Sequence, residues 1–384
     1  MNLLLWRLIR QKPVRRCGFC AIAGVKGNVT FTMTGYYSLT NGGKRIMKEN
    51  KYQRRIGNWQ LLLTLVGVLS LLLSGCGAKK PQVYRVGILA GLGFVADITD
   101  GFKAGMAELG YVEGENITYD VQATEFDMAV YQSILNKFVA DKVDLIVVFP
   151  TEASVEAKIA TQGTDIPVIF TFALIEGMGL VDSVREPGGN MTGVRYPGPD
   201  IAVKRFEILR EIAPEAKRIW MPYQRDYPIV QSQLDVLYPV AEAAGVTLIE
   251  FPASNPAELE AELSARAQQD DVGMDAILFL VEPLAVTPDD YLVIGKFAYE
   301  HKIPLGGAFM TAEGYDSIFG VNVISYDTGL LAAPLADKIF KGTPAGTIPV
   351  VSAENFVQLH YTAAQRLGVT IPEELLSQAD EVVR

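Results

Sequence analysis

Short aliphatic segments alternate with amphipathic helical segments along most of this chain, and this alternation restricts its fold more than any other feature. The first series starts with YRVGILA at 84–90 and includes DLIVVFP at 144–150. The unbroken aliphatic run of 144–150 is typical of a strand buried on both faces of a parallel sheet. The pattern restarts after residues 197–199, with further strand-like segments such as RIWMPY at 218–223. The sequence therefore predicts an α/β fold of two doubly wound parallel-sheet lobes with a cleft between them.

The length of 384 residues also exceeds what one hydrophobic core usually serves. We expect lobe 1 to comprise 83–197 plus about 325–347, and lobe 2 to comprise 198–324 plus about 348–384. Near the C-terminus we expect a strand around 349–358 and a helix over 372–383.

A segment typical of protein export precedes the lobes. Lys48, Lys51, Arg54 and Arg55 precede a 13-residue apolar run, Leu61–Leu73. As a helix this run spans roughly 20 Å, which is short of the roughly 30 Å hydrocarbon core of a bilayer. It fits a cleaved signal peptide at 47–75 better than a permanent membrane span.

Leu73-Ser74-Gly75-Cys76 resembles the bacterial lipobox, in which the cysteine is acylated and becomes the new N-terminus. This resemblance predicts a lipid-anchored protein with Cys76 as the lipidation site and 76–82 as a tether. Because a signal peptide normally begins a chain, we interpret 1–46 as a non-native upstream extension or disordered leader and Met47 as the true start. A genuine cytoplasmic extension is the alternative.

Charge and cysteine use exclude several classes of protein. Residues 1–75 hold 12 Lys and Arg against one Glu, which leaves 22 basic and 43 acidic residues from the totals of 34 and 44. Because residues 76–384 are so acidic, the phosphate backbones of nucleic acids would repel them. We therefore expect no nucleic-acid partner. Cys17 and Cys20 form a lone CxxC, and His301 and His360 are far apart in sequence, so we expect neither a metal site nor a cofactor.

Three segments resemble one family of ABC-transporter substrate-binding proteins, which includes tryptophan/phenylalanine-type binders and has the type I periplasmic-binding fold. They are GFKAGMAELGYVEGENITYDVQATE at 101–125, GLVDSVREPGGNMTGV at 179–194, and the C-terminal stretch 338–383. The family commonly has a polar Asp-Pro turn after the fourth strand, whereas this chain has the more apolar segment 171–176 there.

Candidate ligand-binding residues follow the predicted strands, because ligands of open parallel sheets bind beyond the carboxyl ends of the strands. In lobe 1 they are Gly93, Phe94, Thr151, Ser154, Phe172 and Ala173. Gly93 permits close backbone approach or simply a tight turn, and Phe94 can stack on a ligand. Thr151 and Ser154 open a helix whose N–H groups suit a carboxylate, although an ordinary N-cap is the alternative.

In lobe 2 the candidates are Tyr223, Glu282 and Gly307. Glu282 is the sharpest of them, because a carboxylate just past a buried strand suits an ammonium group. Its alternative role is that of a loop carboxylate that caps the 288–301 helix region.

The resemblance implies an extracytoplasmic solute-binding lipoprotein, monomeric and lipid-anchored to the outer face of the bacterial cytoplasmic membrane. It would bind a small molecule, with an amino acid favoured, and deliver it to an ABC permease and its ATPase. A nucleobase or sugar as ligand, or a receptor for a separate membrane sensor, are the alternatives. The sequence contains no nucleophile elbow, P-loop or complete dinucleotide fingerprint, so we expect no enzyme.

Overall fold

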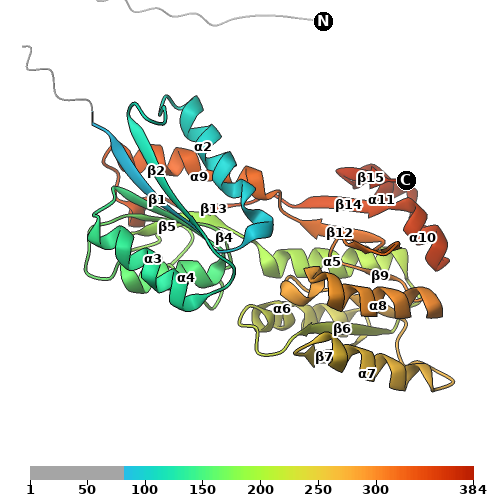
Figure 1. Ribbon diagram of the computed structural model, residues 1–384. Coiled ribbons are helices and arrows are strands. Elements are labelled where there is room, and N and C mark those ends of the chain that lie inside the picture. Colours follow the sequence, from blue (N-terminus) through green and yellow to red (C-terminus); the bar gives the residue numbers. More distant parts are fainter. Residues whose placement is uncertain (1–81) are drawn as a thin grey trace, which may run out of the picture. The chain divides into compact units, whose positions relative to one another are not determined.

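The computed structural model describes residues 82–384 (Figure 1). The expected leader, the signal peptide at 47–75 and the lipidation site Cys76 lie outside these residues. The first series of segments forms one parallel six-stranded sheet in the order β13-β5-β4-β3-β1-β2. The strands are β1 (Tyr84–Ala90), β2 (Ile117–Ala123), β3 (Leu145–Phe149), β4 (Val168–Ala173), β5 (Met191–Arg195) and β13 (Val351–Ser352).

The buried strand β3 shows why this sheet has helices on both faces. All five of its residues are buried, as the unbroken aliphatic run predicts. Leu145, Val147 and Phe149 belong to one hydrophobic cluster, while Ile146 and Val148 belong to a second. Successive side chains of a strand point to opposite faces, so each face needs its own apolar cover. Two pairs of helices supply it (Figure 1): α2 (Asp97–Glu108) with α9 (Ser325–Phe340), and α3 (Met128–Ala140) with α4 (Thr151–Ala160).

The second series forms a parallel sheet in the order β7-β6-β8-β9 and an adjoining sheet in the order β12-β14-β15. An isolated bridge between Gly307 and Gly320 joins the two sheets. The strands are β6 (Arg218–Gln224), β7 (Thr247–Ala253), β8 (Ala276–Leu278), β9 (Leu305–Gly306), β12 (Phe319–Asn322), β14 (Phe356–His360) and β15 (Glu381–Val383). The helices are α5 (Gly198–Ile212), α6 (Val230–Ala243), α7 (Pro256–Ala267), α8 (Pro288–His301), α10 (Tyr361–Leu367) and α11 (Glu373–Gln378). A small hairpin, β10 (Thr311–Ala312) with β11 (Tyr315–Asp316), completes the set.

The expected helix over 372–383 is wrong in its second half. Helix α11 ends at Gln378, and 381–383 is strand β15, parallel to β14. The backbone N–H of Asp380 donates to the carbonyl of Val357 at 2.9 Å, which draws the chain onto the open edge of β14. Pairing with a strand edge therefore outweighs the local helical pattern.

The expected strand near 349–358 is two strands, β13 and β14, that belong to different sheets. The lobe limits stay a prediction, but this pairing places Val351–Ser352 with the first sheet and not with the second. Asp127 caps α3 as expected, accepting hydrogen bonds from the N–H groups of Ala129 and Val130. Among residues 82–384, no helix combines the length and apolar character needed to cross a bilayer.

Candidate functional site

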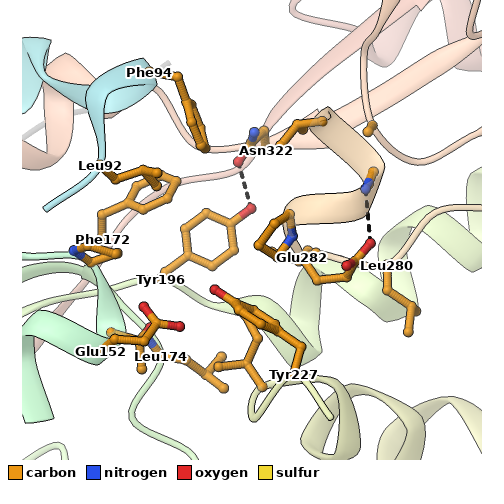
Figure 2. Close-up of a pocket in the computed structure, with 18 of the residues that line it drawn as sticks. Leu92, Phe94, Glu152, Phe172, Leu174, Tyr196, Tyr227, Leu280, Glu282 and Asn322 are labelled. Carbon is orange, nitrogen blue, oxygen red and sulfur yellow. Dashed lines mark hydrogen bonds between the residues drawn. The ribbon is translucent and has the colours of Figure 1, made fainter. Parts of the chain in front are cut away.

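A pocket with an empty volume of about 640 Å³ lies at the carboxyl ends of strands from both series. From the first series it takes residues after β1, β2, β3 and β4, and from the second it takes residues after β6 and β8. Its walls are mainly aromatic and aliphatic (Figure 2), with the lining residues Leu92, Phe94, Phe126, Phe172, Leu174, Tyr196, Tyr227, Ile229, Leu280 and Val286 among them.

Of the nine predicted ligand-binding residues, the pocket brings together Phe94, Thr151, Phe172 and Glu282. Phe94 remains 60% exposed although it lines the pocket, so one of its faces is open to solvent. The ring of Phe172 packs on that of Tyr196 with the centroids 4.6 Å apart.

Thr151 lines the pocket without capping α4 in the expected way. It is the first residue of the helix, and its hydroxyl oxygen accepts a hydrogen bond from the N–H of Leu174 at 3.0 Å. The hydroxyl hydrogen of Thr151 therefore remains available to a ligand acceptor.

The other five predicted residues are not in the pocket lining. The hydroxyl of Ser154 donates to the carbonyl of Pro150 at 2.7 Å, and Ala173 is buried in the lobe core. The phenol of Tyr223 donates to Glu250 at 2.6 Å, and Gly307 lies against the carbonyl of Phe279. Gly93 is an exposed residue whose N–H donates to Glu125 at 3.2 Å. Sequence position alone placed these residues at strand ends, but their side chains or backbone groups face other partners.

Glu282 is in the lining, but its carboxylate is already satisfied by backbone donors. It accepts hydrogen bonds from the N–H groups of Gln224, Leu284 and Ala285 at 2.9–3.0 Å. It thereby caps the short 3₁₀ segment Pro283–Val286, which is close to the capping role that was the alternative. Burial raises the pKa of Glu282 to about 7, against the lowering effects of these N–H donors and of Arg205.

Glu152 is the carboxylate that sequence reasoning missed. It lines the pocket from the first turn of α4, and neither of its two buried carboxylate oxygens has a hydrogen-bond partner within residues 82–384. Its carboxylate and the hydroxyl of Tyr227 point toward one another (Figure 2), although the pair does not meet the geometry of a hydrogen bond. Burial, next the charge of Glu152, and then the approach of the Tyr227 hydroxyl to that carboxylate as a hydrogen-bond donor, raise the pKa of the Tyr227 phenol far above its usual range.

Arg205 supplies the positive charge of the pocket. Its guanidinium is only 2% exposed and donates to the carbonyls of Phe279 and Val321 at 2.8–3.0 Å. Within the described chain it forms no ion pair with a carboxylate, and burial lowers the pKa of Arg205 to about 10. Guanidinium has five N–H donors, so some remain for another acceptor.

Two of these missed residues left a signal in the sequence. Arg205 is a charged residue on the apolar face of a helix, one turn from Ile201 and Leu209, and a charge in that position needs a special partner. Glu152 lies between Thr151 and Ser154, the two hydroxyl residues that the sequence predicts to bind the ligand. Tyr196, Tyr227 and Asn322 enter the pocket only through the tertiary arrangement. Among residues 82–384, no group of acidic, cysteine and histidine side chains has the geometry of a metal site.

Comparisons with known proteins identify the family of this chain. Residues 93–383 match the family model described as ABC transporter substrate binding protein. A tyrosine-binding protein of Clostridioides difficile (strain R20291) is 31% identical over 265 residues, covering 66% of this chain and 71% of that protein.

Solved structures share the fold. One is a domain from Streptococcus pneumonia in complex with L-Trp, with 24% identity and a TM-score of 0.66 over 79% of this chain and 100% of that one. Another is the ligand-free, open structure of a substrate binding protein with adhesive properties from Clostridium difficile, with 24% identity and a TM-score of 0.62 over 78% and 99% of the two chains. The periplasmic-binding fold expected from the sequence is confirmed. Proteins of this family bind small-molecule solutes outside the cytoplasm and are not enzymes. By its family match and its relative, this chain belongs to the ABC transporter substrate-binding proteins.

Proposed function

We propose that this protein binds an amino acid with an apolar, aromatic side chain and delivers it to an ABC permease. The observation that carries the proposal is the carboxylate of Glu152, which is buried and unpartnered within residues 82–384 while it faces an aromatic pocket. Charge-assisted hydrogen bonds are about twice as strong as neutral ones, so a carboxylate without a partner at a pocket wall suits a ligand ammonium. A ligand ammonium would donate to Glu152 and complete its hydrogen bonding.

The carboxylate of the same ligand has donors close to Glu152. Thr151 offers its hydroxyl hydrogen, and the first N–H groups of α4 have no intrahelical acceptor. A helix N-terminus attracts anions through these N–H groups and the helix dipole. An α-amino acid carries its two charges on one carbon, so neighbouring groups of α4 suit both of them.

The apolar remainder of the pocket favours an aromatic side chain. Phe94, Phe172 and Tyr227 present ring faces or edges to the cavity (Figure 2), and aromatic rings pack on each other by stacking or edge contacts. The two relatives named for tyrosine and crystallised with L-Trp support the same class of ligand.

Calorimetric titration with a panel of amino acids, one sugar and one nucleobase tests the proposal. We expect binding of aromatic amino acids and no binding of their N-acetyl derivatives, which lack the ammonium charge. Glu152→Gln should weaken amino-acid binding about 10- to 150-fold, because hydrogen bonds to charged groups contribute about 1.5–3 kcal/mol.

Glu156→Gln is the matched control. Glu156 is on the same helix, one turn later, and its carboxylate accepts a hydrogen bond from Gln132 outside the pocket. This change should leave affinity as it is. Full affinity in Glu152→Gln, or equal binding of N-acetyl amino acids, would remove Glu152 as the ammonium site.

A further inference from the structure

The side-chain amide of Asn322 has an orientation that its neighbours determine. Its Oδ1 accepts hydrogen bonds from the hydroxyl of Tyr196 at 2.6 Å and from the N–H of Val323 at 2.9 Å. A backbone N–H can only donate, so the atom facing it must be the oxygen. The Nδ2 group of Asn322 is therefore the free end of the amide, and no acceptor within residues 82–384 takes its two hydrogens. Asn322 lines the pocket, so these donors are offered there.

The hydroxyl of Tyr196 offers an acceptor next to the amide donor of Asn322. It gives its single hydrogen to Asn322, which leaves the lone pairs of its oxygen as acceptors. Tyr196 lines the pocket and is 4% exposed, and burial raises its pKa to about 12, so the phenol keeps its hydrogen at neutral pH. Tyr196 and Asn322 together thus present one acceptor and one donor group side by side.

Asn322 and Glu152 lie on different sides of the Tyr196 ring (Figure 2). The Tyr196 hydroxyl is directed to Asn322, and the ring of Phe172 packs on the Tyr196 ring. A ligand whose charged end is at Glu152 directs its side chain along these rings toward Asn322. The far end of that side chain then meets the donor and acceptor pair.

We propose that Tyr196 and Asn322 form a hydroxyl-recognising subsite that selects tyrosine over phenylalanine and tryptophan. This inference rests on the proposed function, because it assumes that the ligand is an amino acid held at Glu152. A phenol donates one hydrogen bond and accepts others, so it satisfies both the Tyr196 oxygen and the Asn322 amide. The indole N–H of tryptophan only donates, and phenylalanine offers neither group. A site that hydrogen-bonds a ligand hydroxyl discriminates strongly against the analogue without it, because its own polar groups are left unpaired.

Calorimetric titration of the protein with tyrosine, phenylalanine, tryptophan and O-methyltyrosine tests the subsite without any substitution. We expect tyrosine to bind at least about tenfold more tightly than the other three. O-methyltyrosine keeps the oxygen but loses the donated hydrogen, so it reports on the Tyr196 acceptor in the unaltered protein.

Two variants separate the roles of the two residues. Asn322→Leu removes the amide donor without adding a carboxylate that would accept from the tyrosine phenol, and Tyr196→Phe removes only the hydroxyl. In each, the preference for tyrosine over phenylalanine should fall to about twofold or less, while phenylalanine affinity changes little. Tyr223→Phe is the control, because it removes a phenol that is bonded to Glu250 outside the lining.

The outcomes distinguish this inference from the function on which it rests. Aromatic amino acids that bind with equal affinities would overturn the subsite and leave the proposed function standing. A loss of tyrosine and phenylalanine affinity by the same factor in Asn322→Leu would mean that Asn322 contacts the part common to both ligands, and would also overturn it. If none of the amino acids binds, the proposed function fails and the subsite fails with it.

Discussion

Glu152 and Glu282 line the same pocket, yet their surroundings give them opposite roles. Glu282 accepts three backbone hydrogen bonds and caps a short 3₁₀ segment, so its carboxylate serves the fold. Glu152 has no hydrogen-bond partner within the described part of the chain, so its carboxylate is left for a ligand. Both follow buried strands in the sequence. The difference between them is in which backbone N–H groups the tertiary structure places within reach.

The pKa of Glu282 leads to a prediction at the residue scale. Burial raises this pKa from 4.5 to about 7, so between these values the folded protein binds a proton that the unfolded chain has released. Stability therefore falls as pH rises through this window. Glu282→Gln has no such titration, so this loss of stability is absent from it. Between pH 4.5 and 7.5 the free energy of unfolding of the parent should therefore fall by roughly 2–3 kcal/mol more than that of Glu282→Gln.

Urea unfolding of both proteins across this pH range measures the difference. Glu258→Gln is the control, because the pKa of Glu258 is lowered by its hydrogen bond with Arg225 and its removal should not reproduce the trend. Parallel pH profiles for the parent and Glu282→Gln would contradict the assignment of a raised pKa to Glu282.

At the scale of elements, helices α2 and α9 are joined by unusually close packing. A Cβ atom added to Gly101 would be 2.0 Å from the carbonyl oxygen of Tyr326, and one added to Gly329 would be 2.1 Å from that of Ile98. Such distances are far inside van der Waals contact, so only glycine fits at these crossings. These two helices, distant in sequence, together cover one face of the first sheet (Figure 1).

Gly329→Ala should therefore destabilise the protein, by about 1–3 kcal/mol as in other overpacked cores. The sign is diagnostic, because alanine in place of glycine within an exposed helix normally stabilises it by about 1 kcal/mol. Thermal or urea unfolding of the ligand-free protein gives the measurement. A variant as stable as the parent, or more stable, would show that the two helices are not packed as closely as described.

At the scale of the whole molecule, the sequence predicts a lipid anchor at Cys76 ahead of the lobes. We propose that this anchor holds the binding protein, as a monomer, at the outer face of the membrane, where it meets the permease. The lipobox-like Leu73-Ser74-Gly75-Cys76 and the preceding apolar run Leu61–Leu73 support this proposal. A receptor for a membrane sensor would use the same anchor and pocket, and the family of the chain favours transport.

Cys76→Ser should release the protein from the membrane fraction of bacterial cells, because the lipid is attached to the thiol sulfur of the cysteine. Fractionation followed by intact-mass measurement would show the parent protein in the membrane fraction with the added mass of acyl chains. Ser70→Ala is the control, since Ser70 lies in the apolar run ahead of the predicted cleavage point and should not alter the partition. Parent protein found without acyl mass, or a Cys76→Ser protein still bound to the membrane, would contradict the anchor.

Much of the fold followed from local patterns in the sequence. The unbroken aliphatic run predicted strand β3, and Asp127 predicted the start of α3. Both signals depend on residues that are near one another in the chain. The C-terminal strand β15 gave no such signal, because its conformation depends on the free edge of β14.

By itself, the sequence determined the two series of strands and helices, the acidic body and the edge of the sheets at which a ligand would bind. Only the tertiary structure decided which polar groups at that edge are free. The sequence predicted Glu282 and Ser154 as ligand-binding residues, but their side chains already form hydrogen bonds with nearby backbone groups. Glu152 and Asn322 became candidates only once their neighbours were known. Hydrogen-bond satisfaction depends on atoms brought together from distant parts of the chain, and no local pattern records it.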